Sequence, residues 1–180
     1  MVGENNDINL SVTQSTEDKA SSIWKLLSEV YDPEVPVLTI IDLGIVRGVH
    51  YDPLFLPAGS WGIIITPTYS GCPAMDVISM NIRMKLLEHG IKNFHIKTQL
   101  SPAWTTDWMS ENGKAQLKAY GIAPPQGRVN GNIFGDAEAI VCPNCRSLHT
   151  RLLSEFGSTS CKALYQCVDC KEPFDYFKCH

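Results

Sequence analysis

The sequence predicts an α+β protein in two parts, a compact αββαβ(α) domain followed by a small module built on four cysteines. Between residues 18 and 123, apolar residues at helical spacing alternate with short β-branched runs. After residue 139 the composition changes, and six of the seven cysteines lie between residues 142 and 179. We therefore expect a flexible tail at 1–17, the α+β domain at 18–123, a linker at 124–138 and the cysteine-rich domain at 139–180.

The composition is that of an ordinary globular protein, with 44% hydrophobic and 19% charged residues. The formal net charge of -4 argues against a nucleic-acid-binding surface. The N-terminal residues lack the cationic start and apolar core of a secretory signal, and no apolar run is long enough to span a membrane. We expect a cytoplasmic protein, in which cysteines are metal ligands or reactive thiols rather than disulfides.

The first half of the domain is expected to form a helix and a β-hairpin. A helix is predicted over 18–30, ending before Asp32-Pro33, because the residue before a proline avoids helix. Leu43-Gly44 predicts a turn, followed by a strand over 45–51 and a second strand at WGIIIT, 61–66. The apolar face of the helix comprises Ile23, Leu26, Leu27, Val30 and Tyr31.

The second half is expected to add a helix, a strand and a final helix. Pro73 suits the first position of a helix, and Gly90 is its expected end. A third strand is predicted near Phe94–Thr98. A last helix is expected from Thr105 or Thr106 to Tyr120, stopped by Gly121. The stripe that the helix after Pro73 should bury comprises Ala74, Ile78, Ile82 and Leu86.

The cysteine module contains CPNC at 142–145 and CVDC at 167–170, which is the spacing of a four-thiolate metal site. We expect Cys142, Cys145, Cys167 and Cys170 to bind Zn²⁺, or an iron–sulfur cluster, which uses the same ligands. So short a module needs the metal to fold. Cys161 and Cys179 are either alternative ligands or small buried residues, and His149 and His180 are expected to be surface or packing residues.

Cys72, in SGCPAM, stands apart from the other cysteines at the predicted start of a helix. The unpaired N–H groups there would lower the pKa of its thiol and favour a reactive thiolate. Asp32, Glu34 and Asp76 would oppose ionisation if the loops converge, but they would suit a cation. Alternatively, Cys72 is only a packed cap, and Asp32, Glu34 and Asp42 are only loop caps.

Trp104, Asp107 and Trp108 are a candidate partner surface at a helix start. The alternative is that the two tryptophans simply pack against the domain.

Several motifs, most of them long, carry a family resemblance. DPEVPVLTIIDLGIVRGV and TPTYSGCPAM resemble the SufT-like iron–sulfur assembly domain. SPAWTTDWMSENGKAQLKAYGIAPP, CPNC and SEFGSTSCKALYQCVDCKEPFDYFKC resemble the PaaD family of bacterial phenylacetate degradation, with its C-terminal zinc ribbon. The resemblance covers about residues 20 to 180.

The resemblance implies an accessory factor of the multicomponent phenylacetyl-CoA oxygenase, a ring 1,2-epoxidase, rather than an enzyme. It implies that Cys72, beside Asp32 and Glu34, carries a transient iron–sulfur cluster. It implies that Cys142, Cys145, Cys167 and Cys170 are the ribbon ligands. The implied partners are the iron–sulfur reductase, the other oxygenase subunits and the iron–sulfur assembly machinery.

Three other functions compete with this one. The protein could be a structural oxygenase subunit with a purely structural zinc ribbon. A thiol redox protein would need its CxxC thiols free of metal, and a nucleic-acid-binding ribbon conflicts with the acidic charge. The residues leave the oligomeric state open, a homodimer included.

Overall fold

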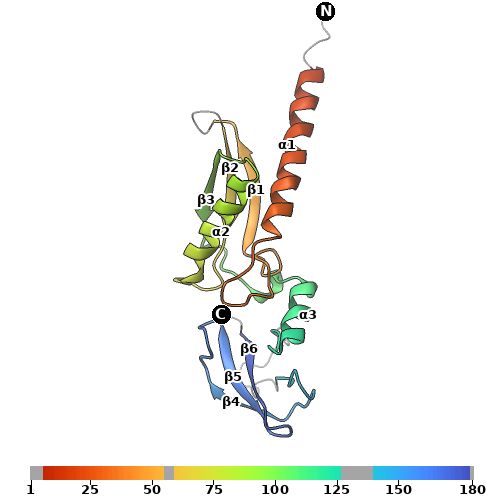
Figure 1. Cartoon of the computed structure of the whole chain (residues 1–180), viewed down its shortest axis with the longest axis vertical. Helices are drawn as coiled ribbons and strands as arrows, with labels where there is room; N and C mark the ends of the chain where they lie inside the picture. Colours follow the sequence, from red (N-terminus) through yellow and green to blue (C-terminus); the bar gives the residue numbers. More distant parts are fainter. Residues whose placement is uncertain (1–5, 55–58, 127–139, 179–180) are drawn as a thin grey trace, which may run out of the picture.

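The computed structural model describes residues 6–54, 59–126 and 140–178, and it has two three-stranded sheets in two parts of the chain (Figure 1). The upper part holds α1 (Asn6–Leu27), β1 (Val46–Asp52), β2 (Ser60–Ile65), α2 (Ala74–Glu88) and β3 (Phe94–Thr98). The lower part holds β4 (Thr150–Ser154), β5 (Lys162–Cys167) and β6 (Pro173–Phe177), with α3 (Glu111–Tyr120) between the two. The predicted α+β class is confirmed.

The upper sheet has the order β1-β2-β3, with β1 and β2 antiparallel as the predicted hairpin requires. β2 and β3 are parallel, because α2 connects them as a crossover. β2 is the central strand, and Ile63 and Ile65 are fully buried in it. The residues of α2 that are buried are those of the predicted stripe, Ala74, Ile78, Ile82 and Leu86.

The first helix differs from the expectation of a flexible tail at 1–17 followed by a helix over 18–30. The helix α1 begins at Asn6, so most of the expected tail is helical, and no glycine or proline between residues 6 and 17 interrupts it. It ends at Leu27, before the predicted position. Val30 and Asp32 belong to the following turn, where Ile40 N–H donates to the Val30 carbonyl and Asp32 N–H donates to the Leu38 carbonyl.

The expected single helix over 105–120 is also wrong, because the chain breaks within it. A 3₁₀ turn (η1, Thr106–Trp108) is followed by Met109 in extended conformation, and Ser110 then caps α3 by accepting a hydrogen bond from Gly113 N–H. The Ser110 side chain hydrogen-bonds to the backbone and so favours the start of a new helix over the continuation of an earlier one. Helix propensities summed along the segment do not include this effect. The predicted end is confirmed, since Gly121 adopts φ 91° at the helix C-terminus.

The side chain of Asp42 joins the start of α3 to the turn at Leu43-Gly44. Its carboxylate accepts hydrogen bonds from the Ser110 hydroxyl at 2.5 Å, from Thr39 at 2.8 Å and from Asn112 at 3.2 Å. The turn itself needs glycine, because Gly44 has φ 67° and a Cβ atom there would lie 2.4 Å from the Trp108 carbonyl oxygen. The turn and the start of α3 are therefore one packed unit.

The lower sheet has the order β4-β5-β6, antiparallel throughout. It is joined to the chain after α3 by two backbone hydrogen bonds, from Ala123 N–H to the Asp175 carbonyl at 2.8 Å and from Phe177 N–H to the Ala123 carbonyl at 2.9 Å. Most of the predicted linker, and Cys179 and His180, lie outside the described residues.

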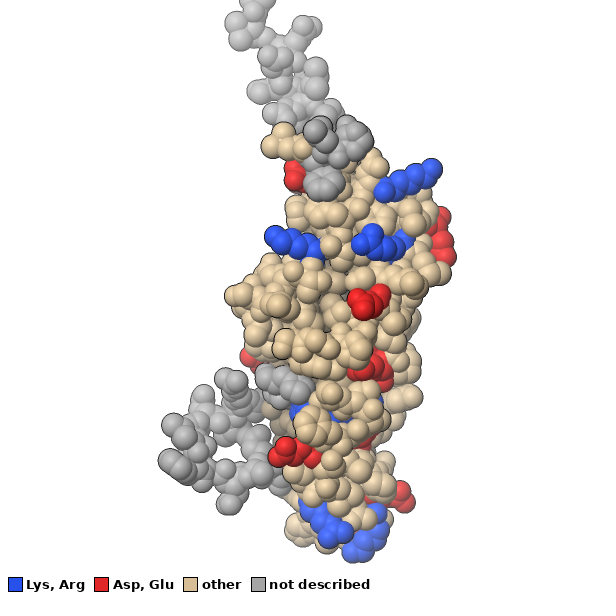
Figure 2. All heavy atoms as spheres, turned by 90° about the vertical axis from the view of Figure 1, so that its left-hand side faces the viewer, with Lys and Arg blue, Asp and Glu red and all other residues tan. Residues whose placement is uncertain are grey.

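The charge distribution agrees with the low net charge. On the face in Figure 2, the Lys and Arg side chains of the described residues lie in small separate groups with acidic side chains between them. That face carries no continuous basic stripe of the kind that follows a nucleic-acid backbone. Among the described residues, none of the helices has the length and apolar character needed to cross a membrane.

We predict that Asp42→Asn destabilises the protein by about 1–3 kcal/mol at neutral pH, because an amide cannot satisfy all the donors around it. Burial acts to raise the pKa of Asp42, but the hydrogen bonds from Ser110, Thr39 and Asn112 outweigh it and hold the pKa below 3.8. A lowered folded-state pKa stabilises the protein above the unfolded pKa, and this contribution is lost as pH falls through the folded value.

The measurement is urea unfolding of both proteins as a function of pH. The difference between them should shrink as pH falls below about 4. The exposed substitution Asp107→Asn is the control, and its unfolding should match that of the unsubstituted protein throughout. A variant as stable as the unsubstituted protein at neutral pH would contradict this role of Asp42.

Candidate functional site

The four cysteines of the two CxxC motifs meet in the lower domain. Their sulfur atoms all lie within 4.8 Å of one another, with Sγ–Sγ distances of 3.8 Å for Cys142–Cys170 and 3.5 Å for Cys145–Cys167. A tetrahedral ion with metal–sulfur bonds of about 2.3 Å holds its sulfurs about 3.8 Å apart. The donor set and its spacing therefore fit a bound metal ion.

Each CxxC motif is a turn of the same shape. The residue after each motif, Arg146 and Lys171, has a positive φ, 65° and 67° respectively, which turns the backbone back toward the sulfurs. Backbone N–H groups of Cys170 and Asp169 lower the pKa of the Cys167 thiol to about 6. The second turn thus favours the thiolate form of Cys167, which is the form that binds a cation.

The loops around Cys72 converge as the motifs suggested, but the helix begins one residue later than expected. Pro73 is the N-cap of α2, and Cys72 precedes it. Cys72 is half-buried, and burial raises the pKa of its thiol more than the Ala74 N–H and Tyr69 hydroxyl lower it. The expectation of a thiol acidified by the helix end is therefore wrong, because desolvation outweighs the helix terminus.

Asp32 and Glu34 lie beside Cys72 in one narrow pocket. The Asp32 carboxylate accepts hydrogen bonds from the backbone N–H groups of Glu34 at 2.8 Å and Val35 at 2.7 Å, which closes the turn at Asp-Pro-Glu. Asp32 is buried, and burial raises its pKa although these hydrogen bonds oppose the shift. Both acids raise the pKa of Cys72, so the group as a whole is suited to a cation.

Of the two alternatives for Cys161, the structure supports a small buried residue and not an alternative ligand of the ribbon, because Cys161 lies apart from the four ribbon cysteines. It lines the same pocket as Cys72, and its Sγ lies 3.6 Å from Glu34 Oε2. It is buried, which raises the pKa of its thiol to about 11. No signal in the sequence pointed to this position. Cys161 does not form a CxxC pair with Cys167, and no known motif links it to Cys72.

The proposed partner surface of Trp104, Asp107 and Trp108 is partly wrong. Trp104 is buried, and its indole N–H donates to the Leu43 carbonyl at 2.8 Å, so it supports the turn rather than a partner. Trp108 is half-buried under the Arg47 guanidinium, 3.5 Å from the ring centre. Asp107 is exposed, and the part that it and Trp108 play toward a partner stays a prediction.

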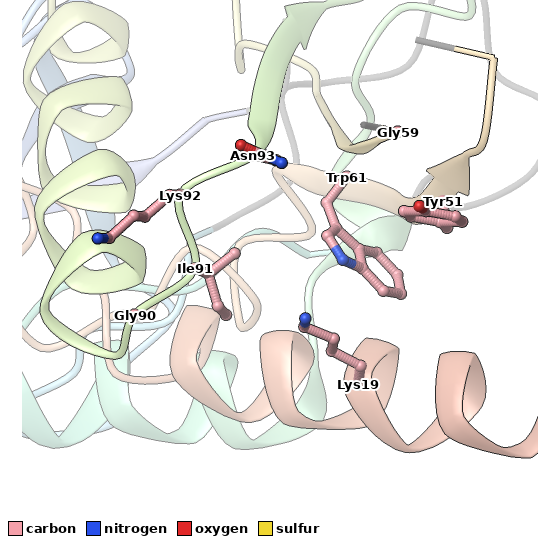
Figure 3. Close-up of a pocket in the computed structure, with 8 residues that line it drawn as sticks. All are labelled: Lys19, Tyr51, Gly59, Trp61, Gly90, Ile91, Lys92 and Asn93. Atoms are coloured by element: carbon pink, nitrogen blue, oxygen red, sulfur yellow. The ribbon is translucent and has the colours of Figure 1, made fainter. Parts of the chain in front are cut away.

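A second, wider cavity of about 310 Å³ lies between α1 and the sheet (Figure 3). Lys19 points from α1 toward the Trp61 indole, with Tyr51 on the neighbouring strand. None of its lining residues is a cysteine, histidine or acid, which are the side chains that most often bind metal ions.

Comparison with known proteins matches both parts of the chain to family models. Residues 20–90 match the iron–sulfur cluster assembly protein model, and residues 126–178 match the PaaD zinc β-ribbon domain. The upper domain resembles the crystal structure of DUF59, a domain of unknown function, from Bacillus anthracis. That structure has a TM-score of 0.52 and 25% identity, over 58% of this chain and 96% of that chain.

Two curated relatives match most of the chain. An "Fe-S protein maturation auxiliary factor" from Porphyromonas gingivalis is 34% identical over 61% of this chain and 97% of its own length. A "Putative 1,2-phenylacetyl-CoA epoxidase" subunit from Escherichia coli K12 is 49% identical over 87% of this chain and 91% of its own length. The chain therefore belongs to the PaaD family of phenylacetyl-CoA epoxidase subunits, and it combines an iron–sulfur cluster assembly domain with a PaaD zinc ribbon.

Proposed function

We propose that the protein is an accessory maturation factor of the multicomponent phenylacetyl-CoA oxygenase, not a catalyst in its own right. Its task is to receive iron, alone or in an iron–sulfur cluster, at Cys72 and to pass it to the iron–sulfur reductase of the oxygenase. The observation that carries this proposal is the half-buried thiol of Cys72 in one pocket with Asp32 and Glu34. The names of the two curated relatives, an epoxidase subunit and a maturation factor, support it.

The chemistry of the pocket suits temporary binding. Burial and the two acids raise the pKa of Cys72, so its thiol is protonated at neutral pH and must give up the proton when it binds iron. The protein's own residues therefore oppose tight binding at Cys72 while the carboxylates attract the cation. A carrier needs this balance, because a site that binds too tightly cannot release its cargo.

The ribbon has a different task in this proposal. Its four sulfurs are spaced for a single tetrahedral ion, which favours zinc over a polynuclear cluster. Zinc does not change oxidation state, so the ribbon supplies folding energy and not electrons.

One observation favours the second candidate, a structural subunit of the oxygenase. Along α2, Val77, Met80, Met84 and Leu87 are exposed and form an apolar stripe on the face opposite the buried one. Such a stripe suits a stable contact with another subunit. A structural subunit would remain bound to the oxygenase, and a maturation factor would leave it once the reductase holds its cluster.

We predict that Cys72→Ser abolishes the transfer of iron–sulfur clusters to the cluster-free reductase, because a hydroxyl is a poor iron ligand beside a thiolate. Transfer is followed anaerobically by the visible absorbance of the reductase after the two proteins are separated. Ser70→Ala, an exposed change in the same loop, is the control and should transfer normally. Normal transfer by Cys72→Ser would reject Cys72 as the carrier.

We also predict that Cys167→Ser removes the metal of the ribbon, lowering zinc from about one per chain to near zero, since a structural site needs all four thiolates. Elemental analysis of the purified protein measures it, and limited proteolysis should then cut the ribbon first. Cys72→Ser serves as the control and should retain its zinc. Full zinc content in Cys167→Ser would mean that the four sulfurs are not the site.

A further inference from the structure

Cys161 belongs to the ribbon by sequence and to the other domain by packing. It directly precedes β5, yet it is buried in the main hydrophobic core with Phe177 and not in the small core around Cys142 and Cys167. Its side chain is 4% exposed. The ribbon therefore inserts this thiol into the assembly domain.

The position of Cys161 is held by several interactions. Lys178 N–H donates to the Cys161 carbonyl at 3.1 Å, and the hydroxyl of Thr159, two residues earlier in the chain, lies 3.0 Å from the Cys161 sulfur. Phe177, at the end of β6, packs edge-to-face on Trp104, with ring centres 6.2 Å apart. Cys161 is thus placed by the same contacts that join the two domains.

Cys161 meets the groups of the Cys72 pocket from the opposite domain. Its sulfur lies 3.6 Å from Glu34 Oε2, and it lines the pocket with Cys72 and Asp32. The Tyr69 hydroxyl is hydrogen-bonded both to Cys72 and to Ser160, the neighbour of Cys161. The pocket therefore combines two thiols and two carboxyl groups, drawn from three distant parts of the chain.

We propose that Cys161 is the second thiol of the Cys72 site, so that iron is held by Cys72 and Cys161, with Glu34 beside them, between the two domains. This inference rests on the proposed function and adds a ligand to it. Two thiolates and a carboxylate suit a borderline cation such as Fe²⁺. Binding involves no change of oxidation state, and each thiol that binds iron releases its proton to solvent.

The site must open to take its cargo. Among the described residues, the four ribbon cysteines are the only group of three or more histidine, cysteine or acidic side chains whose ligand atoms all lie within 4.8 Å of one another, so the groups around Cys72 must move closer to share one ion. The pocket at Cys72 has a volume of only about 10 Å³, which is room for about one water molecule. Because Cys72 is half-buried and Cys161 is buried, cargo reaches Cys72 first, and Cys161 joins it as the ribbon and the assembly domain adjust.

The charges around the pocket are compatible with a cation. Asp32 and Glu34 face Cys72, and Glu34 also faces Cys161. Lys162 is a cation that acts on this pocket, since its charge lowers the pKa of Asp32 and of Cys161, and its ammonium group also lies 3.7 Å from Asp175. Two acids thus remain to balance the iron.

The test measures iron bound to the zinc-loaded full chain without oxygen, in two arms, Fe²⁺ alone and Fe²⁺ with sulfide. Cys161→Ala and Cys72→Ala should each weaken iron binding by about 100-fold or more. Loss of a group that only supports a metal ligand lowers metal affinity by about 10–100-fold, and loss of the ligand itself should cost at least as much. X-ray absorption of the Fe²⁺ arm should find two sulfur ligands per iron in the unsubstituted protein and one in each variant. Zinc content and melting temperature confirm that the ribbon is intact, and Ser70→Ala is the control.

The outcomes separate this inference from the proposed function. If Cys72→Ala loses iron and Cys161→Ala keeps it, Cys161 is not a ligand and the proposed function stands. If both variants keep their iron, the carrier role of Cys72 fails as well. If Cys161→Ala loses its zinc or fails to fold, the sulfur count in the unsubstituted protein decides, and one sulfur per iron rejects the inference. Retention of iron only in the arm with sulfide would identify a cluster as the cargo, and retention in both arms would identify the ion.

Discussion

The structure depends on the short backbone contact between Ala123 and β6. Its two hydrogen bonds, 2.8 and 2.9 Å long, add the chain after α3 to the edge of the ribbon sheet. Phe177 then reaches the main core and packs on Trp104, whose indole N–H holds the turn at Leu43. These contacts also position part of the Cys72 pocket. Cys161 and Phe177 both belong to the ribbon, and both lie in the main core and line that pocket.

Desolvation, more than the helix terminus, decides the chemistry at Cys72. A thiol at an exposed helix start is acidified by unpaired N–H groups, but this one is half-buried with two acids nearby, and its pKa rises. The same factor acts on Cys161, where burial raises the pKa of the thiol to about 11. The four ribbon sulfurs differ in another way, since they lie close enough together to hold one metal ion.

The helices were predicted correctly where a single feature of the local sequence determined them. The stripe along α2 and the end of α3 at Gly121 follow from periodicity and from glycine's access to positive φ. Prediction failed where signals competed. Ser110 interrupts the expected helix because its hydroxyl is committed to a cap and to Asp42. Trp104 lies inward, where its N–H donates to a buried carbonyl.

By itself, the sequence determined the α+β class, the family, and the cluster of four cysteines in the ribbon, since a CxxC motif places two sulfurs on one turn whatever the rest of the chain does. Only the tertiary structure decided that Cys161 leaves the ribbon and faces Glu34, 127 residues away along the chain. No local pattern encodes that contact, because it arises from how two separate parts of the chain meet at Ala123 and Phe177.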